Sequence, residues 1–158
     1  MTIKQKAAAA LQGIASNFAG PRTLSIEENG LRVQCELAAV DSLACAFDRL
    51  SLDTARLAQA TVQELESLAD KLSRRLTYLL EPIGTIEIDA EHCIVQMRSK
   101  PPQVGEGSTY YELLVRRGGE LSLCRYQKQP GDVRQTIPAH VTREVLLRLI
   151  DDFAVVAA

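Results

Sequence analysis

The segment that most constrains the fold of this chain has helical periodicity and covers residues 54–80. Its apolar residues recur at spacings that keep one stripe on one face of an α-helix: Leu57, Val62, Leu65, Leu68, Ala69, Leu72, Leu76 and Leu79. Thr61 followed by Glu64 forms a capping-box pattern inside the segment, and Pro82 predicts its end. About 27 residues rising 1.5 Å each predict a helix roughly 40 Å long.

Alternating strands surround this predicted helix. Asn29-Gly30 joins two alternating runs, and this dipeptide favours the type I′ turn of a β-hairpin. The predicted strands are Thr23–Glu27, Leu31–Ala39, Leu43–Leu50, Thr85–Asp89, Cys93–Arg98, Thr109–Arg117 and Glu120–Lys128. A first helix ends near Ala19, and Thr142 caps a closing helix.

The order α-βββ-α-ββββ-α predicts an α+β fold: an antiparallel sheet with one long central helix packed on it. Two irregular segments, 99–108 and 129–139, hold four of the six prolines. The sequence shows no internal repeat and no linker that would divide it in two, so we expect residues 1–158 to form a single α+β domain.

Charge and composition argue against nucleic acid and membranes as partners. The net charge is −2, and aromatic residues make up 4% of the chain, with no Trp. Nucleic-acid binders usually carry a basic excess and aromatic side chains on which bases stack. No apolar run reaches the roughly 18–20 residues that span a bilayer. We therefore expect a cytoplasmic protein.

The four cysteines, Cys35, Cys45, Cys93 and Cys124, form no CxxC pair and match no zinc-binding spacing. Each falls in a predicted strand, where a free cysteine behaves as a small apolar residue. We expect all four to be reduced and mostly buried.

Catalytic and metal-binding motifs are missing from the sequence. It contains no phosphate-binding loop, nucleophile elbow or zinc-protease signature. We therefore expect no catalytic residue, no cofactor and no metal ligand, and we favour a non-enzymatic protein. His92 and His140 are interpreted as surface residues. A row of acids, Glu87, Asp89 and Glu91, could hold a cation but is more typical of a solvated strand face.

Basic residues offer a second weak signal. Several of them could gather into an anion-binding face: Arg74, Arg75, Arg116, Arg117, Arg125, Lys128 and Arg134. Arg116-Arg117 precedes Gly118-Gly119, so an exposed turn explains that pair more simply.

The apolar stripe of the predicted helix is wider than packing on one sheet requires. We expect part of it, Leu68, Leu79 or Leu80, to contact another chain. The predicted length of the helix points the same way, so we expect a homodimer.

The element order, with Leu72–Leu76 leading into Gly84–Glu91, resembles the class I type III secretion chaperones and the YbjN-like proteins that share their fold. The resemblance covers about residues 7–153. It implies a small, cytoplasmic, homodimeric protein whose sheet and helix surfaces hold an extended segment of a partner. The additional hairpin 109–128 departs from that pattern.

Two functions therefore remain open. The first is a non-enzymatic, chaperone-like homodimer that binds a protein or peptide. The second is an enzyme or small-ligand binder with a site between the sheet and the loops 99–108 and 129–139, because such loops often carry binding sites. A polar pocket lined by Arg, Glu or His from these loops would favour the second function.

Overall fold

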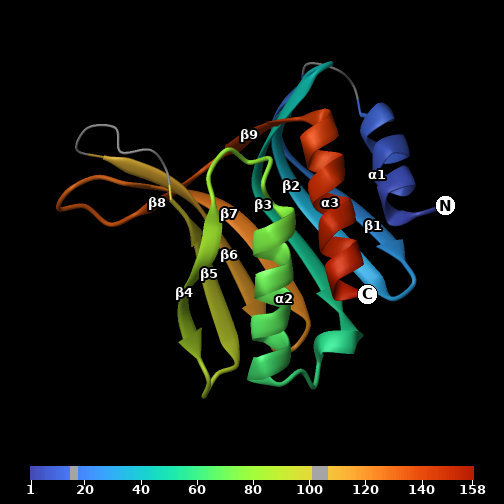
Figure 1. Cartoon of the computed structure of the whole chain (residues 1–158). Coiled ribbons are helices and arrows are strands. Elements are labelled where there is room, and N and C mark those ends of the chain that lie inside the picture. Colours follow the sequence, from blue (N-terminus) through green and yellow to red (C-terminus); the bar gives the residue numbers. More distant parts are fainter. Residues whose placement is uncertain (15–17, 101–106) are drawn as a thin grey trace.

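The computed structural model describes residues 1–14, 18–100 and 107–158. Within them the chain forms an α+β fold of three α-helices and a nine-stranded antiparallel sheet (Figure 1). The elements are α1 Ile3–Gln12, β1 Phe18–Glu28, β2 Leu31–Val40, β3 Ala44–Thr54, the 3-10 helix η1 Ala55–Leu57, α2 Val62–Arg75, β4 Ile83–Asp89, β5 Ile94–Ser99, β6 Ser108–Arg116, β7 Glu120–Lys128, β8 Gln135–Ile137, β9 Ala139–Thr142 and α3 Arg143–Ala157. No helix in this part of the chain is long and apolar enough to cross a membrane.

The main path of the sheet runs β1-β2-β3-β7-β6-β5-β4, with hairpins forming both ends. The predicted Asn29-Gly30 turn joins β1 to β2, and both residues have the positive φ that a type I′ turn requires. In the middle, the second half of β3 pairs with β7 and its first half pairs with β9. β8 pairs with β7, so β8 and β9 continue the sheet where β3 and β7 diverge.

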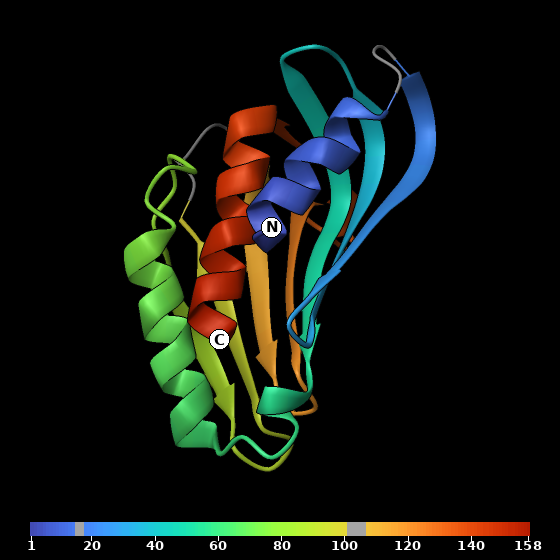
Figure 2. The same ribbon diagram turned by 90° about the vertical axis from the view of Figure 1, so that its right-hand side faces the viewer.

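All three helices lie on one face of the sheet (Figure 2). The alternation predicted for β2 is confirmed: Leu31, Val33, Cys35 and Leu37 are buried beneath the helices. The helices α2 and α3 are joined by Asp152, which accepts hydrogen bonds from Arg75 Nε at 2.9 Å and Tyr78 Oη at 2.7 Å. The opposite face, which we call the open face, carries the polar positions of the same strands.

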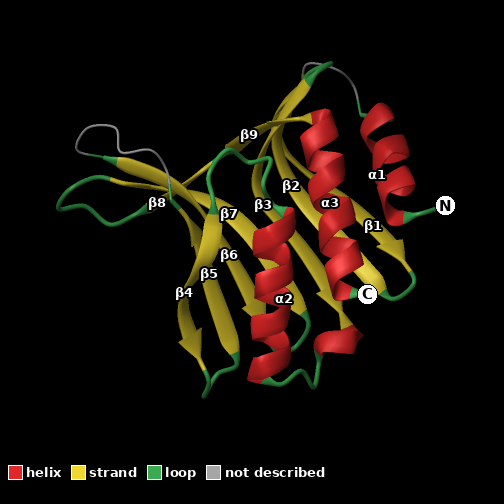
Figure 3. Cartoon of the chain, in the orientation of Figure 1, coloured by secondary structure: helices red, strands yellow, loops and turns green. Residues whose placement is uncertain are grey.

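The prediction of a helix over residues 54–80 is wrong in extent. Figure 3 shows a short α2 instead: it spans fourteen residues, about 21 Å. Its start is at the predicted Thr61 cap, because Thr61 accepts a hydrogen bond from the backbone N–H of Glu64 at 3.2 Å. The residues up to Thr54 remain in β3, which pairs with β2 to that point, and Ala55–Leu57 form η1. At the other end the helix stops well before Pro82.

The end of α2 has a tertiary cause. Leu76 leaves the helical conformation and becomes buried, and Tyr78 turns to Asp152 on α3. Ser73 donates a hydrogen bond to the carbonyl of Ile83 at 2.6 Å, which holds the start of β4 beside the helix. These contacts outweigh the helical preference of the sequence.

The predicted element order also lacks two strands. The segment 129–139 contains β8 and the first residue of β9, so six strands rather than four follow α2. Both strands are too short to produce a visible alternation, and Pro138 separates them. For the loop 99–108, residues 101–106 lie outside the described residues. The seven predicted strands are all present, with ends shifted by a few residues.

The four cysteines are free, and Cys35, Cys45 and Cys93 are buried. Burial raises the pKa of Cys45 to about 11 and also raises the pKa of Cys35 and Cys124. Cys35, Cys45 and Cys124 lie in β2, β3 and β7 as predicted, whereas Cys93, predicted to begin a strand, lies in the β4–β5 turn with a φ of +52°.

The three leucines predicted to contact a partner have different environments. Leu68 and Leu79 are each 7% exposed and belong to the chain's own hydrophobic core, whereas Leu80 is 91% exposed. The prediction of a 40 Å helix with surplus apolar surface is therefore wrong, because the apolar residues of α2 pack in the chain's own core. The homodimer itself remains a prediction.

Candidate functional site

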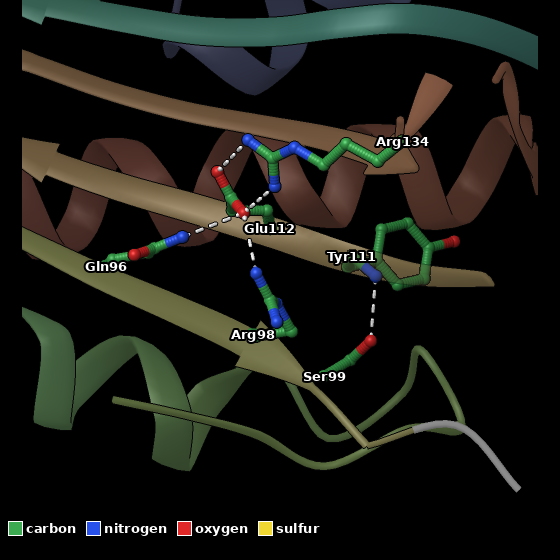
Figure 4. Close-up of polar contacts among 6 residues, drawn as sticks. All are labelled: Gln96, Arg98, Ser99, Tyr111, Glu112 and Arg134. Atoms are coloured by element: carbon green, nitrogen blue, oxygen red, sulfur yellow. Dashed lines mark hydrogen bonds and ion pairs between the residues drawn. The ribbon is translucent and has the colours of Figure 1, made fainter. Parts of the chain in front are cut away.

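The polar cluster with the deepest buried charge lies on the open face, over β5, β6 and β7 (Figure 4). Its centre is Glu112 on β6, which is only 4% exposed. The strand positions on either side of it, Tyr111 and Leu113, point into the core under the helices. Strand alternation therefore forces Glu112 onto the open face, where neighbouring side chains must satisfy its charge.

Three side chains converge on this carboxylate. Gln96 Nε2 donates to Oε2 at 2.9 Å, and Arg98 Nη2 lies 3.5 Å from the same oxygen. Arg134, from the segment before β8, donates to both oxygens of Glu112. One buried carboxylate thus holds two guanidinium groups, and the resulting trio carries a net positive charge.

Each arginine also stacks on a tyrosine. The guanidinium of Arg98 lies 4.4 Å from the ring centre of Tyr110, and that of Arg134 lies 3.9 Å from the ring centre of Tyr126. Tyr110 and Tyr126 are paired across β6 and β7, with their ring centres 6.0 Å apart. The aromatic faces fix the planes of both guanidinium groups.

The cluster keeps Glu112 ionised. Burial raises the pKa of its carboxyl group. The hydrogen bonds from Arg134 and Gln96, together with the charges of Arg134 and Arg98, lower that pKa by more than burial raises it. The net result is a pKa below the ordinary glutamate value. The hydrogen bond to Glu112 in turn raises the pKa of Arg134.

Arg98 is held less completely than Arg134. Its Nε is buried, and no acceptor among the described residues takes a hydrogen bond from it. Its single ion pair, with Glu112, is 3.5 Å long, whereas Arg134 makes two hydrogen bonds to that carboxylate. About 37% of the Arg98 side chain is exposed, so its outer nitrogens can reach a bound molecule.

Beside the cluster the open face is hollowed to a volume of about 650 Å³. The hollow is broad and shallow, and its lining comes from β4, β5, β6, the end of β7 and the segment before β8: Glu87, Gln96, Arg98, Ser108, Tyr110, Lys128, Asp132, Val133 and Arg134. Its volume is in the range of small-molecule sites. The arrangement can bind and orient an anionic group.

The structure gathers only part of the predicted basic set. Lys128 and Arg134 line the hollow, as the anion-binding interpretation required. Arg75 pairs with Asp152 in the helical layer, and Arg117 lies at the β6–β7 turn, where its Nη1 is 3.6 Å from Cys93 Sγ. Arg125 points to the helix-covered face.

That face has a polar cluster of its own near the start of β4. Arg125 Nη2 donates to Glu81 at 3.0 Å and to Thr109 Oγ1 at 2.9 Å. The Ser99 hydroxyl donates to Glu81 at 2.7 Å and accepts from the backbone N–H of Tyr111 at 2.7 Å; the latter bond is drawn in Figure 4. Among the described residues, no side-chain nitrogen or oxygen of this cluster is buried without a hydrogen-bond partner, so we assign it a structural role.

The histidines and the acidic row do not form a metal site. His92 lies beside Asp89, with Nδ1 and Oδ2 2.8 Å apart, and His140 is an exposed residue of β9. Within the described part of the chain, no three His, Cys, Asp or Glu side chains gather as a metal ion would require.

Sequence reasoning missed Arg98, Tyr110, Glu112 and Tyr126. The alternation of their strands gives a signal for them. Each is a large polar or aromatic residue on the open face of a strand whose helix-covered face is mostly apolar. The sequence could not show that β5, β6 and the segment before β8 meet.

Comparison of the chain with protein-family models, curated proteins and solved structures finds no match, so the geometry of this cluster is the basis for assigning a function.

Proposed function

We propose that this chain is a binding protein that takes up a small anionic ligand in the hollow of its open face. The observation that carries the proposal is the convergence of Arg98 and Arg134 on one buried carboxylate at the wall of that hollow. This is the second of the two functions left open by the sequence, with the site between the sheet and the segment 129–139.

The chemistry of the wall favours a carboxylate or phosphate group. Guanidinium groups bind both through paired hydrogen bonds, and Lys128 adds a third cation to the lining. Because Arg98 has a weak ion pair and an unbonded Nε, it gains hydrogen bonds by turning toward an anion. Arg134, held at two points by Glu112, supplies a fixed part of the site.

We expect Arg98→Gln to weaken anion binding about tenfold or more, because it removes a charge-assisted hydrogen bond donor. Valerate and inorganic phosphate, titrated into the protein and followed by NMR chemical shifts of the open face, are the probes. Arg32→Gln is the matched control, since Arg32 is an exposed arginine of β2 outside this hollow. Equal affinities for wild type and Arg98→Gln, or no binding tighter than about 10 mM with either probe, would contradict the proposal.

Binding of a protein partner is the second candidate function, and the edge strand β4 favours it. Among the strands of the described residues, β4 pairs with β5 alone, and its Ile86 and Ile88 side chains are 50% and 45% exposed. Exposed apolar residues on an unpaired edge are available for contact with another chain. A chaperone-like homodimer, as the sequence resemblance implies, would use this edge together with Leu80 in the loop that precedes it.

The homodimer is tested by the mass of the protein in solution. We expect light scattering to give a dimer for the wild type and a folded monomer for the Leu80→Glu, Ile86→Lys double variant, because charges on an edge block its pairing. Leu43→Glu is the matched control: Leu43 is 78% exposed but lies in the turn between β2 and β3. A monomeric wild type at high concentration would rule out this candidate.

A further inference from the structure

The lining of the hollow carries negative as well as positive charge. Arg98, Lys128 and Arg134 are its cations, and Glu87 and Asp132 are its exposed acids. Glu112 lies behind this lining and is already used by the two arginines. The accessible surface of the hollow is therefore not simply basic, which restricts the kind of anion that fits.

Glu87 has a defined place relative to the arginines. It is paired with Gln96 on β5, and Arg98 follows two positions further along that strand, so Glu87 and Arg98 are diagonal neighbours on the open face. Diagonal positions in a regular ladder are about 7–8 Å apart.

Glu87 and Arg98 do not neutralise each other. Arg98 is turned to Glu112 and the Tyr110 ring. Within the described residues the Glu87 carboxylate makes no hydrogen bond or ion pair. The hollow therefore presents two arginines and, at the diagonal position on the neighbouring strand, a carboxylate that they do not neutralise.

We infer that the ligand is dipolar: its carboxylate or phosphate binds at Arg98 and Arg134, and a cationic amino group binds at Glu87. This inference rests on the proposed anion-binding function and narrows its ligand class. A plain anion in the hollow would face the Glu87 carboxylate unfavourably, whereas an ammonium group donates hydrogen bonds to it. An amino acid with separated charges or a short peptide has this chemistry.

The test compares three probes that share one carbon chain: δ-aminovalerate, valerate and pentylamine. They are titrated into the full chain and followed by NMR. We expect δ-aminovalerate to bind about tenfold more tightly than valerate, and pentylamine to bind most weakly. Glu87→Gln should remove the preference for δ-aminovalerate and leave valerate binding no weaker. Glu91→Gln, which changes an exposed acid of the β4–β5 turn outside the lining, should leave both affinities unchanged.

The outcomes separate this inference from the proposed function. If valerate binds as tightly as δ-aminovalerate, or if the preference survives in Glu87→Gln, the dipolar ligand is wrong while anion binding at Arg98 stands. If neither compound shows binding that Arg98→Gln weakens, both the inference and the proposed function fail.

Discussion

Replacing Glu112 by Leu is expected to lower the free energy of unfolding by about 2–3 kcal/mol. The carboxylate is 4% exposed and pairs with both Arg98 and Arg134, so its removal leaves two guanidinium groups without their shared counter-charge. Breaking a fully buried ion pair costs about 3–5 kcal/mol. The smaller value is expected here because each arginine side chain is about one third exposed and regains water. Chemical denaturation measures the change.

Glu112→Gln is the matched control, because it keeps the shape and most of the hydrogen bonds but not the charge. It should lose less stability than Glu112→Leu. The pKa of Glu112 is lowered in the folded protein, so its contribution is present above the ordinary glutamate pKa of 4.5 and disappears as the pH falls through the lowered value. Wild type should therefore lose stability in acid more steeply than Glu112→Gln. Parallel acid profiles would show that Glu112 contributes no charge-dependent stability.

The sequence predicted the sheet well because its strands alternate against one covered face. In β2 the apolar phase from Leu31 to Leu37 is buried, and Arg32 and Glu36 are exposed, as a sheet with helices on one side requires. The helix failed for a related reason. Leu57 matches the periodicity of α2, but it belongs to η1, because β3 continues its pairing to Thr54 and delays the helix to the Thr61 cap. Local periodicity cannot register such long-range pairing.

The site was less predictable than the fold. The basic residues singled out in the sequence included Lys128 and Arg134, but not Arg98, which supplies the weakly held guanidinium. Four separate segments build the cluster, and the pairing of β5, β6 and β7 together with the position of the segment before β8 brings them together. A buried glutamate at the outward phase of an apolar strand is the local sign that such partners exist, since its charge must be satisfied.

The two halves of the sheet meet along a short seam between β3 and β7, from Leu50–Asp53 to Glu120–Leu123. Gly119, in the turn before β7, extends this seam. Its carbonyl accepts a hydrogen bond from the backbone N–H of Thr54 at 2.8 Å, and its φ is +102°. The two backbones are so close that a Cβ at Gly119 would lie 2.0 Å from the carbonyl oxygen of Thr54.

Gly119→Ala is therefore expected to lower the free energy of unfolding by about 3–5 kcal/mol, because the turn must move away from β3 and lose this hydrogen bond. Gly118→Ala is the matched control: Gly118 has a φ of +101°, but nothing lies within 4 Å of a Cβ placed there. It carries only the cost of positive φ, about 1–2 kcal/mol. Denaturation of the two variants separates backbone crowding from conformational strain. Equal losses would mean that the approach of Gly119 to Thr54 does not constrain the seam, and that the β3–β7 ladder from Leu50 to Asp53 holds the two halves of the sheet without it.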